Sequence, residues 1–132
     1  MDKLTYLGIV EKTKTGYSLF FPDFPGCVTV GKTFDEVLKN AQEALSLHHY
    51  GMTEDGEIIP GPSDITNLAK EDIEGNIICP VTIYPDRYKK EYKNRRVKTN
   101  CTIPLWLKNA GEAAGLNFSR LLEKAIEEEL QI

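Results

Sequence analysis

The sequence has 132 residues, of which 41% are hydrophobic and 27% are charged, with a formal net charge of −4; this suffices for one modest globular domain or two small ones. No apolar run approaches the ~20 residues that cross a bilayer, and the start of the chain lacks the basic-then-apolar order of a secretory signal, so we expect a cytoplasmic protein. The three cysteines are far apart and the two histidines are adjacent, which fits neither a disulfide framework nor a metal site, so we expect no metal and no cofactor.

Charge is distributed unevenly along the chain. Residues 1–86 hold six Lys and Arg against fourteen Asp and Glu, whereas residues 87–132 hold ten against six. The basic side chains of the second part crowd into Arg87-Tyr-Lys-Lys-Glu-Tyr-Lys-Asn-Arg-Arg-Val-Lys98. This pattern predicts an acidic module for a basic partner and a basic module for nucleic acid, although a solvated linker beside an acidic domain would give the same charges.

Four short strands are predicted in the first two thirds of the chain, over residues 6–11, 17–21, 27–30 and 77–84. Pro22 and Pro25 break the chain after the second strand, and Pro80 favours an edge position for the fourth. Asp23 is interpreted as a turn former that bonds to its own following backbone amide. Residues 52–76 are expected to form loops with a short strand and a short helix, and residues 85–94 a charged connector.

A helix is predicted to begin after Thr33, because Thr33 and Glu36 have the spacing of a capping box. Gly51 is expected to end it. One face of this helix carries a continuous apolar stripe at period 3.6, made of Phe34, Val37, Leu38, Ala41, Ala44, Leu45 and His48. The expected fold class is therefore α+β, with the stripe packed on a small antiparallel sheet.

The last segment has a pattern of its own. Residues 96–103 alternate with period two, as in a strand, and Pro104 stands at a favoured first helical position. A helix is predicted to Ala114 with Gly115 as its C-terminal cap, and a second from Phe118 to about residue 131 with Asn117 as its N-cap. The sequence thus predicts three parts: residues 1–86, a basic linker at 87–95, and a strand-helix-helix domain at 96–132.

A strand and two helices of this size cannot fold alone, because domains below ~40 residues usually need a partner or a staple. Pairing the strand with its copy in a second chain would give a homodimer with a two-stranded ribbon; further pairing into a tetramer is left open. The dimer core is expected to contain Val97, Thr99, Cys101, Ile103, Leu107, Leu121, Leu122, Ala125 and Ile126. The other ribbon face would present Lys98, Asn100 and Thr102 to base edges in a major groove, and phosphate contacts or steering are expected from Arg95, Arg96, Asn117, Phe118 and Ser119.

Two stretches of sequence resemble known families. Thr102-Ile-Pro-Leu-Trp-Leu107 and Gly115-Leu-Asn-Phe-Ser119 resemble the ribbon-helix-helix family of dimeric bacterial repressors. Gly16-Tyr-Ser-Leu-Phe-Phe-Pro-Asp-Phe-Pro-Gly-Cys27, Thr29-Val-Gly-Lys-Thr-Phe-Asp-Glu36 and Asn40-Ala-Gln-Glu-Ala-Leu45 resemble the HicB antitoxin family, as does the loop Ile59-Pro-Gly-Pro-Ser63. The loop that carries this second resemblance comprises Phe21, Pro22, Asp23, Phe24, Pro25, Gly26 and Cys27.

The HicB resemblance implies a partial ribonuclease-H-like fold without nuclease activity, a HicA-type mRNA-cleaving toxin as partner, and repression of the chain's own operon through operator DNA. Enzyme activity is not expected, because two-metal catalysis needs converging carboxylates. The candidates Glu11, Asp23, Asp35, Glu36 and Glu43 leave no ordered trio once their structural roles are assigned. The alternative is a stand-alone ribbon-helix-helix repressor with an N-terminal ligand-sensing domain.

Overall fold

Four antiparallel strands form the only sheet within residues 3–132, the part of the chain that this computed structural model describes. The strands are β1 (Leu4–Lys12), β2 (Tyr17–Phe20), β3 (Val28–Gly31) and β4 (Ile77–Ile83). Their order across the sheet is β3-β2-β1-β4. Pro80 thus lies on an edge strand, as the sequence predicts. All four strands are close to the predicted ranges.

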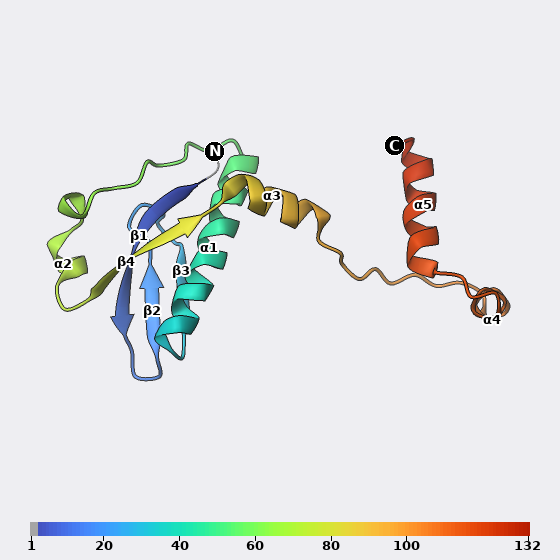
Figure 1. The fold of residues 1–132 in the computed structure, drawn as a ribbon, viewed down its shortest axis with the longest axis horizontal. Coiled ribbons are helices and arrows are strands. Elements are labelled where there is room, and N and C mark those ends of the chain that lie inside the picture. The colour runs from blue at the N-terminus through green and yellow to red at the C-terminus, as the bar shows by residue number, and fades with distance from the viewer. Residues whose placement is uncertain (1–2) are drawn as a thin grey trace. The chain divides into compact units, whose positions relative to one another are not determined.

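One long helix, α1 (Phe34–Glu54), covers one face of this sheet and packs on β2, β3 and β4 (Figure 1). Its start is as predicted, because the Thr33 hydroxyl accepts from the Glu36 backbone N–H; the Glu36 carboxylate accepts from the Lys32 N–H. The prediction that Gly51 ends the helix is wrong, since the helix continues for three further residues.

The apolar stripe of α1 forms the core together with inward-facing strand residues. The buried side chains are Tyr6, Val10, Leu19, Phe21, Phe24, Cys27, Val37, Ala41, Leu45, Val81 and Ile83. Ile9 is also fully buried but lies outside this cluster. Neighbouring positions on a strand point to opposite faces, so Ile9 belongs to the other face of the sheet, on the side where α2 lies (Figure 1).

The segment between α1 and β4 holds a 3-10 turn, η1 (Ile65–Asn67), and one short helix, α2 (Lys70–Ile73), and no strand is found in it among the residues described. The charged connector predicted at 85–94 is instead a helix, α3 (Pro85–Asn94). None of the helices in residues 3–132 is long and apolar enough to cross a membrane.

The chain divides into two compact units, residues 1–95 and 96–132. The second contains α4 (Leu105–Ala113) and α5 (Phe118–Leu130), close to the two predicted helices. Gly115 has φ +69°, and the N–H groups of Gly115 and Leu116 bond back to the carbonyls of Glu112 and Gly111. These two bonds form a Schellman motif, which confirms the predicted glycine cap. The Asn117 side chain caps α5 by accepting from the Arg120 N–H at 3.1 Å.

Candidate interaction surfaces

The turn between β2 and β3, residues 21–27, is part of the core rather than an exposed loop. Phe21, Phe24 and Cys27 are buried, and the Phe24 ring meets Tyr6 edge to face at 4.7 Å between centroids. Gly26 has φ +88°, a conformation that side chains with Cβ rarely adopt. Burial raises the pKa of the Cys27 thiol to about 11, so this thiol is not a nucleophile at neutral pH.

Asp23 ties this turn to a segment forty residues further along the chain. Its carboxylate accepts from the Ser63 backbone N–H at 2.9 Å and from the Ser63 hydroxyl, which corrects the predicted bond to its own following amide. Nearby, the Tyr6 hydroxyl donates to the Pro60 carbonyl at 2.7 Å. Burial raises the pKa of Tyr6, and the charge of Asp23 adds to the rise. The turn and the segment before η1 are thus held against the sheet.

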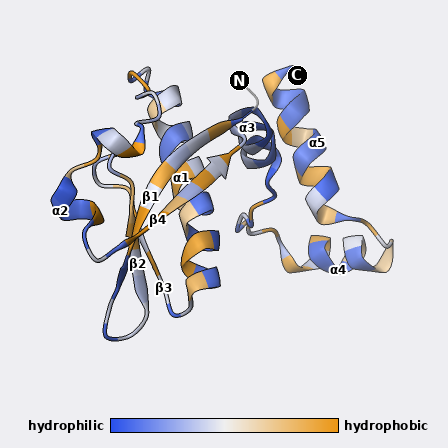
Figure 2. Cartoon of the chain, turned by 60° about the vertical axis from the view of Figure 1, so that its left-hand side comes forward, coloured by the Kyte–Doolittle hydropathy of each residue, from blue (hydrophilic) through white to orange (hydrophobic). Residues whose placement is uncertain are grey.

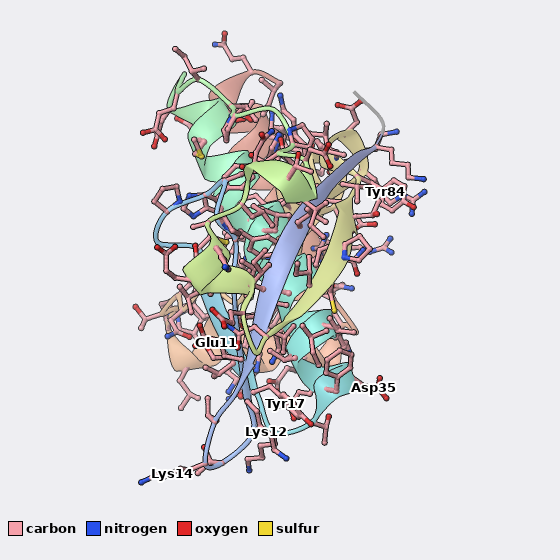
Figure 3. The ribbon with its side chains drawn as sticks, turned by 90° about the vertical axis from the view of Figure 1, so that its left-hand side faces the viewer. Glu11, Lys12, Lys14, Tyr17, Asp35 and Tyr84 are labelled. Carbon is pink, nitrogen blue, oxygen red and sulfur yellow. The ribbon has the colours of Figure 1, made fainter. Side chains whose placement is uncertain are left out.

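The carboxylates considered for catalysis do not converge. Glu11 and Asp35 are well separated (Figure 3), and Glu43 is exposed on α1. Asp23 and Glu36 are engaged in the structural hydrogen bonds described above. Within residues 3–132, no three His, Cys, Asp or Glu side chains are grouped so that they could hold a metal ion.

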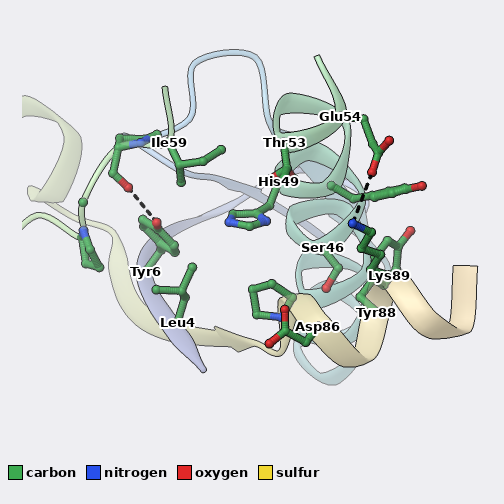
Figure 4. Close-up of a pocket in the computed structure, with 15 residues that line it drawn as sticks. Leu4, Tyr6, Ser46, His49, Thr53, Glu54, Ile59, Asp86, Tyr88 and Lys89 are labelled. Atoms are coloured by element: carbon green, nitrogen blue, oxygen red, sulfur yellow. Dashed lines mark hydrogen bonds and ion pairs between the residues drawn. The ribbon is translucent and has the colours of Figure 1, made fainter. Parts of the chain in front are cut away.

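A pocket of 420 Å³ lies in the first unit where α1, α3 and the loop at 59–62 meet (Figure 4). His49 is nearly buried at its wall, and burial lowers the pKa of its imidazole. An ion pair between Lys89 and Glu54, at 3.9 Å, lies at its rim. The remaining wall is mainly apolar or aromatic, formed by Leu4, Tyr6, Ser46, Tyr50, Thr53, Ile59, Pro60, Gly61, Pro62, Pro85, Asp86 and Tyr88.

Three tyrosines attach α3 to α1. The ring of Tyr50 on α1 lies 4.6 Å from that of Tyr92 and 6.0 Å from that of Tyr88, measured between centroids. Two tyrosine rings also contact arginines, since Arg87 stacks over Tyr84 at 4.7 Å and Arg95 over Tyr92 at 5.1 Å, measured from the guanidinium carbon to the ring centroid. Residues 87–94 are therefore a docked helix of the first unit and not the linker that the sequence predicts.

Because residues 87–94 belong to the first unit, the division of charge between the two units differs from the prediction. The unit 1–95 holds eleven Lys and Arg against fifteen Asp and Glu, and the unit 96–132 holds five of each. The prediction of a basic C-terminal module is thus wrong, because most of the basic cluster lies on α3. Within the first unit, acid concentrates in residues 54–74, with seven Asp and Glu against the single Lys70.

The segment predicted to be the ribbon strand has no regular secondary structure in the single chain. A lone strand has no partner for its backbone groups, so this is the expected state of one copy. Lys98, Asn100 and Thr102 are exposed. Lys98 and Asn100 border a shared hollow of 510 Å³ with Ser119, so the structure brings together a part of the predicted DNA-binding set.

The residues assigned to phosphate are only partly available for it. Arg96, Asn117 and Ser119 line one hollow at the start of α5, but the Arg96 guanidinium donates to Glu123 at 3.0 Å. The Phe118 ring packs on α4, since a Cβ at Gly111 would lie 2.5 Å from it. Arg95 stacks on Tyr92, which leaves the edge of its guanidinium free, and it is the last residue of the first unit.

The predicted dimer core is open to solvent in the single chain. A hollow of 630 Å³ is lined by Thr99, Cys101, Ile103, Leu107, Leu121 and Leu122, together with Ala110, Gly111, Leu116, Phe118 and Ser119. Val97 and Ile126 border the neighbouring hollow with Lys98, and Ala125 is exposed as well. Figure 2 shows hydrophobic and hydrophilic positions alternating along α5, as in a helix that covers a core on one side. Gly111 is the only buried residue of this unit.

The tyrosine cluster is not among the features predicted from the sequence, although the sequence contains a signal for it. Tyr84, Tyr88 and Tyr92 recur every four residues, and Pro85 follows the first of them. That spacing places Tyr88 and Tyr92 on one side of a helix, and proline is favoured at the first helical turn. Because the stretch is highly charged, the sequence prediction for it is a connector and not a helix.

Residues 6–125 match the protein family described as the HicB_like antitoxin of bacterial toxin-antitoxin system. A protein of Haemophilus phage HP1 (strain HP1c1), described as an uncharacterized 14.9 kDa protein in the rep-hol intergenic region, is 34% identical over 98 residues, which are 74% of this chain and 71% of that protein. Among solved structures, a toxin-antitoxin complex from Streptococcus pneumoniae contains a chain that is 28% identical, with a TM-score of 0.58 and coverage of 96% of this chain and 99% of that one. A chain of the HicA3 and HicB3 toxin-antitoxin complex is 31% identical, with a TM-score of 0.51 and coverage of 61% of this chain and 98% of that one.

Proposed function

This chain belongs to the HicB-like antitoxin family of bacterial toxin-antitoxin systems, and we propose that it binds and inhibits a HicA-type mRNA-cleaving toxin and represses its own operon. The family match over residues 6–125 carries the proposal. The similarity to a chain of a HicA3 and HicB3 complex supports the kind of partner. We also propose that the chain is not an enzyme; the dispersed carboxylates described above support this.

We assign toxin binding to the unit 1–95. Its acidic segment, residues 54–74, is suited to a basic RNA-binding partner, because opposite charges steer association and favour the correct partner. Inhibition would follow from covering the RNA-binding face of the toxin, which leaves the toxin itself intact.

We assign operator binding to the unit 96–132, acting as a homodimer. The support is its open apolar hollow, since a unit with almost no buried side chains gains little stability from its own packing. A second copy would cover the hollow and pair the two 96–103 segments into a ribbon. Lys98, Asn100 and Thr102 would then lie together on its outer face.

The experiment that tests this division uses residues 1–95 and 96–132 as separate proteins beside the full chain. We expect the first piece to retain the toxin in a pull-down and to restore growth of cells that express the toxin, while failing to repress the promoter. The second piece should not bind the toxin. Toxin binding by the second piece alone would overturn the division, and absence of toxin binding by the full chain would overturn the antitoxin function.

Replacing Asn100 with Ala should weaken operator binding at one base position by about 1–3 kcal/mol, because an asparagine amide that pairs with adenine reads that base directly. Titration of a promoter fragment and its single-base variants measures this. Asn109→Ala on α4 is the matched control and should leave the affinity unchanged. Equal affinity of the Asn100→Ala variant and the wild type for all fragments would remove Asn100 from the reading surface.

One observation favours a second candidate function. The 420 Å³ pocket has the size and apolar wall of a small-molecule site, as a repressor with a ligand-sensing domain would need. The two functions predict different neighbouring genes and a different effect of small molecules on repression. An antitoxin loses no repression when small metabolites are added and is co-expressed with a toxin, whereas a sensor changes its operator affinity with a ligand and has no toxin partner.

A further inference from the structure

The helix α3 presents basic side chains on the side that faces away from α1. Tyr88 and Tyr92 mark the attached side, because both contact Tyr50. At 100° per residue, Lys90 lies on the opposite side of the helix, with Lys93 at its flank. All of residues 89–95 are exposed.

Lys90 and Lys93 form no ion pair in the part of the chain that the structure describes. Lys89, on the attached side, pairs with Glu54 at 3.9 Å. Arg87 and Arg95, at the two ends of α3, are oriented by aromatic rings. Ring stacking leaves the guanidinium edge free to donate to phosphate oxygens.

The length of the chain limits how far α3 can lie from the proposed DNA-reading residues. Three residues separate Asn94, the last residue of α3, from Lys98. The four Cα–Cα steps between them span at most ~14 Å even when fully extended. The major groove of B-DNA is about 12 Å wide. If Lys98 reads bases within the groove, the end of α3 therefore lies near the phosphates at its edge.

We propose that α3 is a preformed basic arm that binds the DNA backbone beside the bases read by the ribbon, with Lys90 and Lys93 as its phosphate contacts. The inference rests on the proposed operator binding. It adds that the N-terminal unit itself contributes a DNA contact through a helix that the three tyrosines hold in place. A flexible basic linker would have to become ordered on binding, whereas this helix is ordered beforehand.

The test measures binding of the full-length dimer to its own promoter DNA as a function of salt. The measured quantity is the slope of log affinity against log salt concentration, and each lost phosphate contact reduces its magnitude by ~0.9. In the double variant Lys90→Gln/Lys93→Gln, the magnitude of the slope should therefore fall by about two units for each protomer whose α3 contacts the duplex. The control variant Lys12→Gln/Lys14→Gln, at the exposed end of β1 and in the turn that follows it, removes the same charge and should leave the slope unchanged.

A second arm varies the length of the DNA. On a fragment that ends at the outermost recognised base pair, the wild type and the α3 variant should bind equally. On a fragment extended by one helical turn at each end, the wild type should bind at least tenfold more tightly than the variant. Equal slopes and equal dependence on fragment length in the two proteins would overturn the proposal for α3 alone. Failure of the wild type to bind the promoter would instead overturn the proposed repressor function.

Discussion

We expect the Leu122→Asp variant to be monomeric at micromolar concentration and to lose operator binding. Leu122 borders the apolar hollow of the C-terminal unit and the neighbouring hollow with Lys98, and it is 36% exposed in the single chain. In the proposed dimer this position is covered, so the variant would bury an unpaired carboxylate at a cost of about 3–5 kcal/mol. That cost corresponds to a loss of dimer affinity by a factor on the order of 100 or more.

Sedimentation or light scattering across a concentration series measures the dimer, and promoter titration measures operator binding. Leu105→Asp is the matched control, because Leu105 is 73% exposed and does not line the hollow; this variant should remain dimeric. Both variants should still bind the toxin. A dimeric Leu122→Asp protein would show that the hollow is not the interface.

The second large effect is expected in the N-terminal unit, where Gly31→Ala should lower the free energy of unfolding by about 3 kcal/mol. A Cβ at Gly31 would lie 2.5 Å from the Val37 backbone nitrogen and 2.8 Å from its Cα. These are main-chain atoms of α1 and cannot rotate away, so β3 and α1 must separate, which is an overpacking cost in the ~1–3 kcal/mol range or above.

Thermal and urea unfolding of residues 1–95 measure this change. Gly51→Ala is the control, because it places a methyl group within α1 where no atom lies within 4 Å. An alanine in a helix interior should raise stability by roughly 0.5–1 kcal/mol over glycine. Equal melting temperatures for Gly31→Ala and the wild type would show that the close approach of β3 to α1 relaxes without cost.

The sequence predicts those elements whose determinants are local. The capping pair Thr33 and Glu36, the stripe on α1 and the Gly115 and Asn117 caps each depend on residues within a few positions, and the structure has each of them. Pro80 likewise indicated an edge strand without knowledge of its neighbour.

The features for which the sequence prediction is wrong or incomplete depend on partners that are distant in the sequence. The helix α3 needs Tyr50, more than thirty residues before it, to provide its apolar contact. Asp23 binds Ser63, which no local turn rule identifies. The predicted ribbon strand is irregular in the single chain; under the proposed function its bonding partner comes from another molecule. The two helices of the C-terminal unit therefore follow from the sequence pattern, the assignment of DNA-binding residues in that unit stays a prediction, and the placement of the basic residues 87–94 on a docked helix required the fold.

The unpaired state of residues 96–103 has a consequence for gene regulation under the proposed function. Under that proposal the DNA-reading surface forms only in the dimer. As long as most chains are monomeric, the amount of active repressor then rises with the square of the free antitoxin concentration. A twofold fall in free antitoxin would then remove about three quarters of the active repressor. Transcription of the operon would resume while half of the antitoxin remained in the cell.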